Sequence, residues 1–543
     1  MRRVARVTTT DASSADGFTA DERRRLAPYV TNLDRPVFAL TGLPEVVKGA
    51  LFARYSRSPK SLRRLLLDEF LPDAEAAPAT VAADVGEERA DALYGRVLSD
   101  YGDDSVAQLG GAHIAVEDAS NVLTKVLEWG RMASYLEQST RYISYAERVR
   151  GEFRYHRPAE LIADPELADA STDVLDDAFV TYRALIPTVT EHVDAHMPHQ
   201  RGMPVPARRR AVRARALDLL RGMLPAATNA NVGIFASGQA YEAMVVRMAA
   251  HPLPEARECA RQMLTELRKV IPAFLTRADR PDRGIAQGRY LANLDVTAAD
   301  LARNISPPYR HDPPGPSVRL VDFDPDGELR VLAQAVWPFT GGRLAEARAW
   351  VGGLSHEERE RHLRRWAGER EDRRWRPGRA LESTTYTFEI VCDYGAYRDL
   401  QRHRMLTLLA QPLGPDLGYD VPVEVARAGV GDEYARVQDA SADLARRIGR
   451  HHPALIPYAV TLAHRIRFVM TMNAREAMHL IELRSQPQGH ESYRWVAREM
   501  HRLIDVVAGH RAIAGMMDFL DRSDSSTGRL QAERRHEERR LRG

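Results

Sequence analysis

The segment SPPYRHDPPGPS, residues 306–317, divides the chain into two halves. Its five prolines remove backbone donors and favour extended backbone, which predicts a linker. A short apolar strand is predicted to open each half, PVFALTGL at residues 36–43 and VRLVDFD at residues 318–324. Helical stretches, an Arg-rich central segment and a closing helix with Arg and Met then follow in the same order on both sides. This order predicts two diverged copies of one mixed α/β unit.

The closing helices test this duplication at a single register. Five pairs of residues share the offset 484 − 247 = 237, namely Arg247 and Arg484, Arg257 and Arg494, Ala260 and Ala497, Arg261 and Arg498, Met263 and Met500. A solvated helix face also offers arginines, but the ungapped register favours duplication. The central segments align at 403 − 130 = 273. The first copy is therefore predicted to hold 36 additional residues, with residues 160–179 as the candidate.

Length and composition indicate a folded protein with more than one domain. The chain has 543 residues, 44% hydrophobic and 28% charged, which is too long for one core and too apolar for disorder. We predict a flexible tail at residues 1–27, a first domain at 28–305, the linker, a second domain at 318–522 and a charged tail at 523–543. Each domain is expected to pack helices around a small antiparallel sheet, an α/β (α+β) class.

Charge and cysteine content restrict the classes of partner and compartment. The 77 basic and 75 acidic residues nearly cancel, which argues against a nucleic-acid or membrane footprint. The two cysteines, Cys259 and Cys392, lack CxxC or Cys/His metal spacing, so neither a disulfide framework nor a metal site is predicted. No apolar run approaches the ~20 residues that span a bilayer. We therefore predict a cytoplasmic protein.

The first segment with chemical potential is WGRMASYLEQSTRY, residues 129–142. If this stretch enters a helix, Ser134, Glu137, Gln138 and Arg141 lie at i, i+3, i+4 and i+7 on one face. Such a group could hold a base edge and a phosphate. The spacing alone also fits an exposed helix face with a Glu137–Arg141 pair.

Two further segments lie in the second half. LQRHR, residues 400–404, offers donors suited to a phosphate or an electron-rich ring, although a surface basic triplet has the same letters. MNAREAMHLIELR, residues 472–484, places Asn473 and Arg484 three turns apart on one side of a helix, with Arg475 and His479 on an adjacent stripe. The alternative interpretation is a core-docked helix with a polar side. No GxGxxG, GxxxxGK[ST], HExxH, GxSxG or Cys–His arrangement occurs in a suitable context.

Together these segments resemble the flavin-dependent thymidylate synthases. That family has an Arg-His-Arg triplet followed by spaced Ser, Glu, Ser and Arg, then Tyr, and a later Asn-x-Arg helix that ends in a catalytic arginine. The first half keeps the nucleotide-binding tail of this signature, as Ser134, Glu137, Gln138, Ser139, Arg141 and Tyr142. The resemblance implies that these residues bind dUMP.

The triplet itself is damaged in the first half, where it reads Trp129-Gly130-Arg131. Upstream, GDDSVAQ at residues 102–108 resembles the family's GHxSxxEH and keeps Ser105, a flavin-binding candidate. Arg221, before Leu224-Pro225, resembles a dUMP-binding arginine, and Arg247 is aligned with the catalytic one. The Asn-x-Arg pair is absent, with Ala236 and Gly238 in its place.

The second half shows the opposite pattern. Its triplet Arg402-His403-Arg404 is complete, but Ala410, Pro412 and Gly414 replace the Glu, Ser and Arg of the tail. By resemblance, Arg484 is catalytic, and FAD is bound by Arg402, His403, Arg404, Glu382, Asn473, Arg475 and His479, where His479 replaces an Asn. The complementary loss predicts composite sites that take a nucleotide half from one copy and a flavin half from the other.

The resemblance implies reductive methylation of dUMP to dTMP, with FAD as cofactor and with NADPH and methylenetetrahydrofolate as co-substrates. It also implies a homodimer that imitates the family's homotetramer. Two other hypotheses stay open: methylation of a different uracil nucleotide in secondary metabolism, and a non-catalytic flavin- or nucleotide-binding paralogue.

Overall fold

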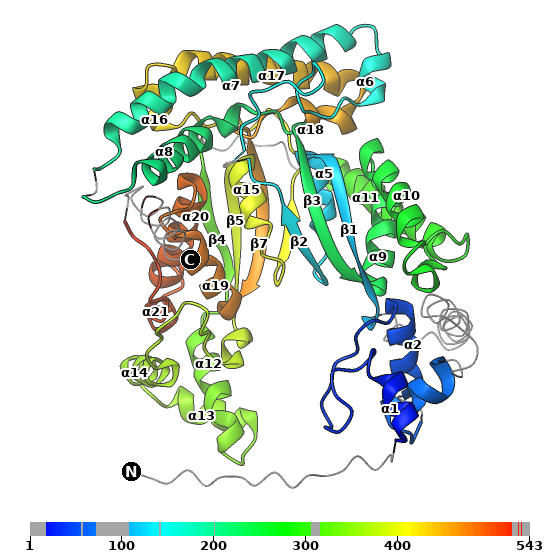
Figure 1. Cartoon of the computed structure of the whole chain (residues 1–543). Coiled ribbons are helices and arrows are strands. Elements are labelled where there is room, and N and C mark those ends of the chain that lie inside the picture. The colour runs from blue at the N-terminus through cyan, green and yellow to red at the C-terminus, as the bar shows by residue number, and fades with distance from the viewer. Residues whose placement is uncertain are drawn as a thin grey trace. The chain divides into compact units, whose positions relative to one another are not determined.

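The computed structural model describes residues 18–55, 58–71, 108–140, 143–199, 201–305 and 315–523, together with residues 530 and 534. These residues form helices around two small sheets with strand orders β1-β3-β2 and β4-β5-β7-β6 (Figure 1). The chain divides into two compact units. Unit 1 contains residues 1–116, 132–136 and 233–306, and unit 2 contains residues 117–131, 137–232 and 307–543. Unit 2 therefore combines the second half of the sequence with part of the first.

The described part of unit 1 is mainly helical. Its elements outside the sheet are α1 (Ala20–Leu26), α2 (Glu45–Tyr55), α3 (Leu62–Leu65), η1 (Leu66–Phe70), α9 (Gly238–Ala249), α10 (Pro254–Leu267), η4 (Pro272–Leu275) and α11 (Gly284–Ile305). The N-terminal tail was predicted to reach residue 27, but Thr19 and Glu22 form a capping box that starts α1. The predicted strand at residues 36–43 is also wrong, because only Leu40 makes an isolated bridge, to Val30.

The three-stranded sheet contains β1 (Gly111–Ser120), β2 (Ala133–Glu137) and β3 (Asn229–Ser237). The remaining first-half elements lie in unit 2 and are α5 (Asn121–Leu127), α6 (Ala159–Ala163), α7 (Ala168–His196), α8 (Val205–Leu220) and η3 (Arg221–Met223).

The four-stranded sheet of unit 2 is antiparallel and consists of β4 (Ser317–Phe323), β5 (Thr385–Asp393), β6 (Thr407–Ala410) and β7 (Arg465–Asn473). The strand predicted at residues 318–324 is therefore confirmed as β4. Tyr386, Phe388 and Ile390 alternate along β5 and are fully buried, as expected for a strand with a core face. Helix α20 (Glu491–Val506) packs against β4 and β5. Helix α19 (Ala474–Arg484) follows β7 directly.

The other second-half elements surround this sheet. They are α12 (Gly327–Val336), η5 (Trp337–Phe339), α13 (Leu344–Gly352), α14 (His356–Ala367), η6 (Arg379–Ser383), α15 (Tyr394–Leu400), α16 (Val423–Arg427), α17 (Gly431–His451), η7 (Pro453–Leu455), α18 (Ile456–Ala459) and α21 (Arg511–Gly515). The predicted C-terminal tail lies outside the described residues, apart from residues 523, 530 and 534.

Helix caps give the repeat its structural register. Ser120 caps α5 and Asp393 caps α15, and both helices have seven residues, so the predicted offset of 393 − 120 = 273 is confirmed. Ser237 caps α9 and Asn473 caps α19, which gives 473 − 237 = 236. The offset is 491 − 254 = 237 only from the start of α10 and α20.

The ungapped register is therefore interrupted by one residue. Counted from the caps, Ser237 corresponds to Asn473, rather than Ala236, and Met248 to Arg484, rather than Arg247. The additional length of the first copy, 273 − 236 = 37 residues, is not confined to residues 160–179. Helix α7 has 29 residues against 21 in α17, and the 16-residue α8 stands where the second copy has only η7 and α18.

Inside unit 2 the two repeats join through a reciprocal contact. Pro225 bridges Thr461, the amide of Ala226 donates to the Val460 carbonyl at 2.8 Å, and the amide of Leu462 donates to the Leu224 carbonyl at 2.9 Å. Because 460 − 224 and 462 − 226 both equal 236, each repeat makes the same bond to the other. This is the pattern of an isologous, two-fold interface within one chain.

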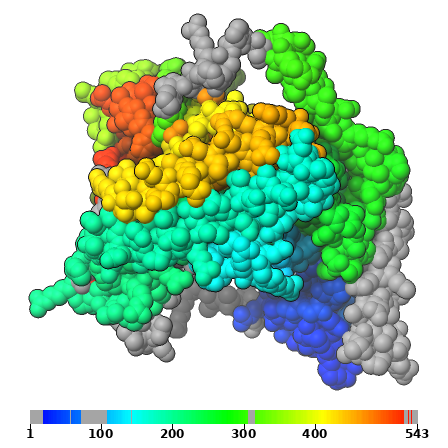
Figure 2. Space-filling view, turned by 90° about the horizontal axis from the view of Figure 1, so that it is seen from above, coloured from blue at the N-terminus to red at the C-terminus, as the bar shows by residue number. Residues whose placement is uncertain are grey.

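Helices α7 and α17 extend this junction. They lie side by side in Figure 2, and the Arg436 guanidinium of α17 donates to Asp177 at 2.7 Å and to Thr181 at 2.9 Å on α7.

Near the junction, Gly222 leaves no room for a side chain. An added Cβ would lie 2.0 Å from the hydroxyl oxygen of Tyr434, which is 1% exposed.

We predict that Gly222→Ala lowers the free energy of unfolding by about 1–3 kcal/mol, because a buried tyrosine must move. Urea unfolding measures this loss. In a Tyr434→Phe background, which removes the clashing oxygen, the same substitution should be less destabilising. Gly233→Ala is the matched control, since its added Cβ meets nothing nearer than 4.0 Å. Equal losses in both backgrounds would contradict the packing described.

Candidate active site

The Arg-His-Arg triplet lies in the turn between α15 and β6. The Asp393 carboxylate caps α15 by accepting from the Ala396 amide at 2.8 Å, and α15 ends at Leu400. Gln401 continues this turn and donates from its side chain to the Lys125 carbonyl at 2.8 Å. The residue that directly precedes the triplet is thus anchored to the first repeat.

Glu137 is the most enclosed acidic group next to the triplet. Its side chain is 0% exposed, and it accepts from Arg398 at 2.6 Å, from Arg402 at 2.7 Å and from Lys125 at 3.2 Å. Burial alone raises the pKa of Glu137, but the three cations outweigh it and hold that pKa well below its usual range. Glu137 is therefore an ionised carboxylate shared between the two repeats.

His403 connects the triplet to α19. Its Nε2 accepts from Nε of Arg484 at 3.0 Å, and its Nδ1 lies 3.1 Å from Oε1 of Glu476. Burial, with Arg484 and His479, lowers the pKa of His403 well below its usual value. A neutral imidazole that accepts at Nε2 must carry its proton on Nδ1, so Nδ1 donates to Glu476.

Asp399 links two of the predicted arginines. Nη1 of Arg221 lies 3.6 Å and Nη1 of Arg484 lies 3.7 Å from its carboxylate oxygens. Arg221 is 4% exposed, and its Nη2 has no hydrogen-bond partner among the described residues. It lines a cavity of about 370 Å³ in unit 2. A buried guanidinium with an unfilled donor is chemically suited to an anion.

These contacts lie within unit 2 and form two sets that meet along the backbone of residues 398–403. One set joins Glu137 of the first repeat to Arg402 of the second. The other joins Arg221 of the first repeat, through Asp399, to Arg484 and His403 of the second. Sequence reasoning missed Asp399, Arg398 and Lys125. The last two occupy equivalent positions in the repeats, since 398 − 125 = 273, and this was the signal that could have found them.

Three of the predicted flavin ligands have structural partners near the start of α19. The Asn473 side chain caps α19 by accepting from the Glu476 amide at 2.9 Å, so it does not stand on a helix face with Arg484 as predicted. Arg475 donates from Nε to the Pro377 carbonyl at 3.0 Å and lies 3.5 Å from Glu382.

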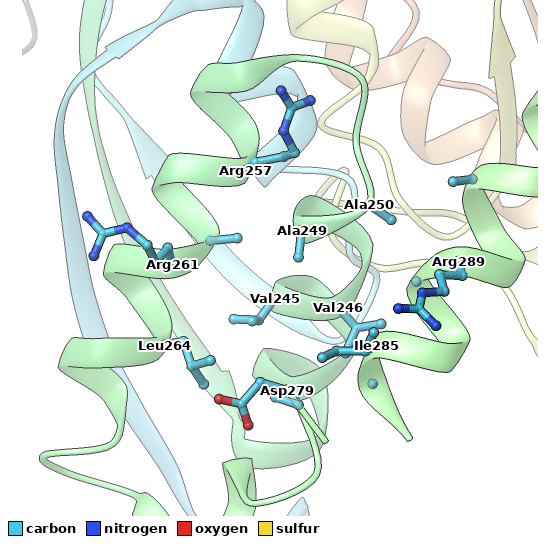
Figure 3. Close-up of a pocket in the computed structure, with 15 residues that line it drawn as sticks. Val245, Val246, Ala249, Ala250, Arg257, Arg261, Leu264, Asp279, Ile285 and Arg289 are labelled. Carbon is cyan, nitrogen blue, oxygen red and sulfur yellow. The ribbon is translucent and has the colours of Figure 1, made fainter. Parts of the chain in front are cut away.

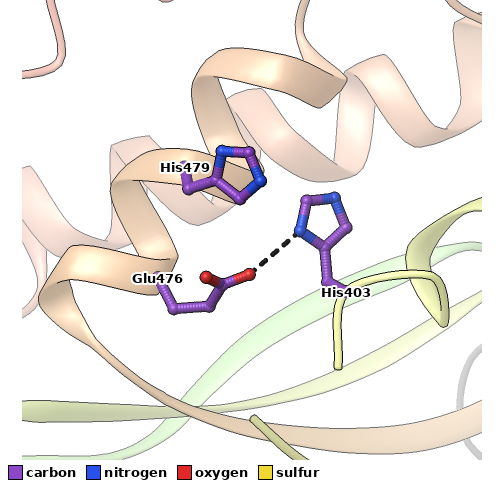
Figure 4. A group of neighbouring side chains, drawn as sticks. All are labelled: His403, Glu476 and His479. Carbon is purple, nitrogen blue, oxygen red and sulfur yellow. Dashed lines mark hydrogen bonds and ion pairs between the residues drawn. The ribbon is translucent and has the colours of Figure 1, made fainter. Parts of the chain in front are cut away.

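Glu476 and His479 lie beside His403, three groups whose ligating atoms are within 4.8 Å of one another (Figure 4). Burial, together with Arg376, Arg373 and Arg484, lowers the pKa of His479 to about 4. Burial raises the pKa of Glu476 to about 7, although Arg376 and Arg475 oppose this shift. So many neighbouring guanidinium groups disfavour a divalent cation. The sequence signal missed for Glu476 is its i, i+3 spacing to His479.

The first-repeat tail differs from the predicted helix face. Ala133–Glu137 form strand β2, in which residues three apart point to opposite sides, so Ser134 and Glu137 do not share a face. Ser134 is exposed and belongs to unit 1. The backbone N–H of Gln138 donates to the backbone carbonyl of Asn231 at 2.9 Å. Ser139 is half-buried. Arg141 and Ser105 lie outside the described residues.

Arg247 belongs to unit 1. Burial lowers its pKa, with Tyr135 opposing, and its Nη2 has no hydrogen-bond partner in the described parts of the chain. Unit 1 also has an apolar cavity of about 460 Å³ among α9, α10 and α11 (Figure 3). Arg257, Arg261 and Arg289 line it, but Arg257 donates to the His251 and Pro252 carbonyls and Arg261 pairs with Glu258. None of the predicted site residues lines this cavity.

The fold and the site define a two-repeat protein with a flavin-dependent thymidylate-synthase-like architecture. The chain belongs to the thymidylate synthase complementing protein (Thy1) family, whose model matches residues 52–273 and 319–508, on either side of the linker. The resemblance inferred from the sequence is thereby confirmed. Membership supports a methyltransferase-like enzyme that acts on uracil nucleotides.

Several relatives match nearly the whole chain. A UPF0159 protein of Chlamydia muridarum is 38% identical over 531 residues, covering 96% of this chain and 99% of the relative. One of Chlamydia pneumoniae is 38% identical over 525 residues, with 96% and 98% covered. One of Thermoplasma acidophilum is 31% identical over 516 residues, with 90% and 97% covered.

Two solved structures are similar to part of the chain. The UMP/dUMP methylase PolB from Streptomyces cacaoi, bound with 5-Br dUMP, has 17% identity and a TM-score of 0.31, covering 37% of this chain and 96% of that one. Thymidylate Synthase X (ThyX) from Helicobacter pylori, with FAD and dUMP, has 16% identity and a TM-score of 0.28, covering 38% and 100%. Among the described residues, no helix has the length and apolar character needed to cross a membrane.

We predict that Glu476→Gln changes the pH dependence of stability. The folded state binds the Glu476 proton more tightly than the unfolded chain does, so the wild type loses stability as pH rises from about 4.5 to about 7. The variant should therefore gain up to about 3 kcal/mol relative to wild type between pH 5 and pH 8. Urea unfolding at both pH values measures this gain.

Glu382→Gln is the control for this experiment. Arg379 lowers the pKa of Glu382 below its ordinary value, so its effect on stability should change little across this pH range. A Glu476→Gln effect that is equally flat would show that Glu476 is ionised throughout.

Proposed function

We propose that the chain catalyses reductive methylation of dUMP to dTMP, with FAD as cofactor, methylenetetrahydrofolate as one-carbon donor and NADPH as reductant. The observation that carries this proposal is a pair of contacts between the repeats in unit 2. Glu137 holds Arg402, and Arg221 shares Asp399 with Arg484, which donates to His403. Family membership supports the same reaction class. The predicted homodimer stays a prediction.

The second-repeat residues fit a flavin chemically. Bound FAD would supply the hydride for reduction of the transferred one-carbon unit. The Arg402 side chain is 39% exposed, so it is anchored on Glu137 yet accessible to a ligand. His403 and Arg404 line a cavity of about 170 Å³ together with Arg131 of the first repeat. Guanidinium groups beside a neutral imidazole suit an electron-rich ring and its phosphates.

Arg221 and Arg484 supply the charges for the nucleotide. The unfilled Nη2 donor of Arg221 suits the 5′-phosphate, since a guanidinium binds phosphate oxygens in a fixed geometry. Arg484, whose side chain is 13% exposed, is oriented by His403 through Nε and by Asp399 through Nη1. A guanidinium held in this way can stabilise negative charge that develops on the N3/O4 edge of the pyrimidine.

The cysteines favour a route without a thiolate nucleophile. Burial, with Glu255 and Glu258, raises the pKa of Cys259 to about 12. Burial raises the pKa of Cys392 well above its usual value. Both thiols are therefore protonated and enclosed at neutral pH, which is unfavourable for nucleophilic attack.

A different uracil nucleotide is the second candidate substrate. Strand β6 ends at Ala410, the position of Glu137 in the first repeat. Pro412 and Gly414 take the places of Ser139 and Arg141, so this tail has lost its carboxylate and its guanidinium but keeps Thr407 and Gln411. Growth of a thymidylate-synthase-deficient strain without thymidine would support dUMP. Product formation from UMP but not dUMP would favour the alternative. Colourless protein that does not oxidise NADPH in the presence of FAD and dUMP would contradict both, and favour the non-catalytic paralogue.

We predict that substitutions in the two repeats separate the ligands. Arg402→Ala should abolish flavin retention, because it removes a charged donor of the triplet. Arg221→Lys keeps the charge beside Asp218 and Asp399 but loses the guanidinium fork, so the dUMP Kd should rise about tenfold while FAD affinity is unchanged. Flavin absorbance and calorimetry measure the two affinities. Equal effects of both variants on one ligand would contradict this division.

We also predict one FAD per chain. At the position related to the intact triplet by the 273-residue offset, Trp129 stands for Arg402 and Ala410 stands for Glu137. This second position lacks both the flavin-binding arginine and the carboxylate that would hold it. Titration of flavin-free protein with FAD, followed by absorbance, should saturate at one equivalent, and saturation at two would contradict the asymmetry.

A further inference from the structure

The two oxygens of Glu137 are used by the opposite repeat. Oε1 accepts from Arg398 and Oε2 from Arg402, at 2.6 and 2.7 Å, and Lys125 supports Oε2 from the same repeat at 3.2 Å. The side chain is 0% exposed. A nucleotide could reach this carboxylate only by displacing a buried ion pair, which is strongly unfavourable.

The Arg402 side chain is bound to Glu137 through one nitrogen, and part of it is accessible to solvent. Its Nη2 is fixed on Glu137, while 39% of its side chain is accessible. In contrast, Arg398 is only 5% exposed and serves the same carboxylate from inside the fold. Glu137 thus fixes the direction of an arginine that faces outward from a buried anchor. A ligand-binding arginine held in one orientation loses less freedom when the ligand arrives.

The two repeats of the chain allow the pair Glu137–Arg402 to be compared with the equivalent position. The 273-residue offset relates Glu137 to Ala410 and Arg402 to Trp129, since 410 − 137 and 402 − 129 both equal 273. Both members of the pair are present at one position, and both are absent at the other. Pro412 and Gly414 replace the Ser and Arg of the tail at the same position, so the second position has lost more than this pair. The joint presence and absence agrees with two residues that act as a unit, and the contacts of Glu137 with Arg398 and Arg402 carry the assignment.

We propose that Glu137 is a positioning residue: its carboxylate holds Arg402 of the other repeat in the orientation that binds flavin, and it does not contact the nucleotide. This inference rests on the proposed function and assigns Glu137 to the flavin half of the site. The role differs from the dUMP-binding one that the family resemblance implied.

The test compares ligand affinities of purified full-length variants. Glu137→Gln keeps the shape but removes the charge, and we expect the FAD Kd, measured by flavin fluorescence, to rise about tenfold or more. The dUMP Kd of flavin-free protein, measured by calorimetry, should change less than about twofold. Glu482→Gln is the matched control. Glu482 is 1% exposed and pairs with Arg370 at 2.6 Å, away from Glu137 and Arg402, and its substitution should leave the FAD Kd within about twofold.

A double-variant cycle separates positioning from general structural damage. If Glu137 acts through Arg402, then Glu137→Gln should weaken FAD binding less in an Arg402→Lys background, which lacks the guanidinium that Glu137 holds, than in the wild type. Glu137→Asp retains the buried negative charge but withdraws the carboxylate by one methylene from Arg402, so this variant provides the test if Glu137→Gln does not fold. Circular dichroism and thermal unfolding establish folding for each variant.

Three outcomes would overturn the inference. One is a raised dUMP Kd with an unchanged FAD Kd in Glu137→Gln, which would make Glu137 a nucleotide ligand. Another is additive losses in the double variant, which would make the two residues independent. The third is wild-type protein that binds no FAD, which overturns the proposed function as well and is thereby distinguished from the first two.

Discussion

The architecture of unit 2 depends on one buried carboxylate that forms ion pairs with three cations from the two repeats. Removing Glu137 from water is costly, and only its pairing with Arg398, Arg402 and Lys125 offsets that cost. Separating the repeats would leave these charges buried without partners or expose the surfaces around them. The electrostatics therefore tie β2 of the first repeat to α15 of the second. The residues of the candidate site follow from this arrangement, because Asp399 lies in the last turn of α15 and Arg402 and His403 lie in the turn directly after it.

The reciprocal bonds around Pro225 and Thr461 explain how one chain came to hold such an interface. An isologous contact places equivalent residues of two subunits across a two-fold axis, and fusion of the subunits preserves the contact within the chain. Fusion also removes the requirement that both sides be identical. Thr461 stands where the first repeat has Pro225, and its hydroxyl bonds to Gln438 and His464, partners that a proline could not have. The junction keeps its backbone symmetry and loses its side-chain symmetry.

Much of the repeat could be predicted because helices α5 and α15 have equal length and equivalent caps, so the 273-residue offset holds from Ser120 to Glu137. The family signature likewise located Arg402, His403 and Arg484. The strand at residues 133–137 could not be derived from side-chain spacing, because the i, i+3, i+4 pattern is shared by helices and by unrelated polar residues. The burial of Glu137, the proton on Nδ1 of His403 and the role of Asp399 depend on contacts between distant segments, which no local pattern encodes.

The complementary decay of the two motifs has a physical explanation in this geometry. A composite site takes Glu137 and Arg221 from one repeat and Arg402, His403 and Arg484 from the other. A substitution in one half of the signature therefore changes only the composite site to which that half contributes residues. At the second position Trp129 takes the place of the arginine, and Ala410, which takes the place of the carboxylate, is exposed. A carboxylate at position 410 would have no arginine of the other repeat to hold, so its absence leaves no buried charge without a partner. At the surviving site the loss of either Glu137 or Arg402 would break a pair whose carboxylate is fully buried, and that site keeps both residues.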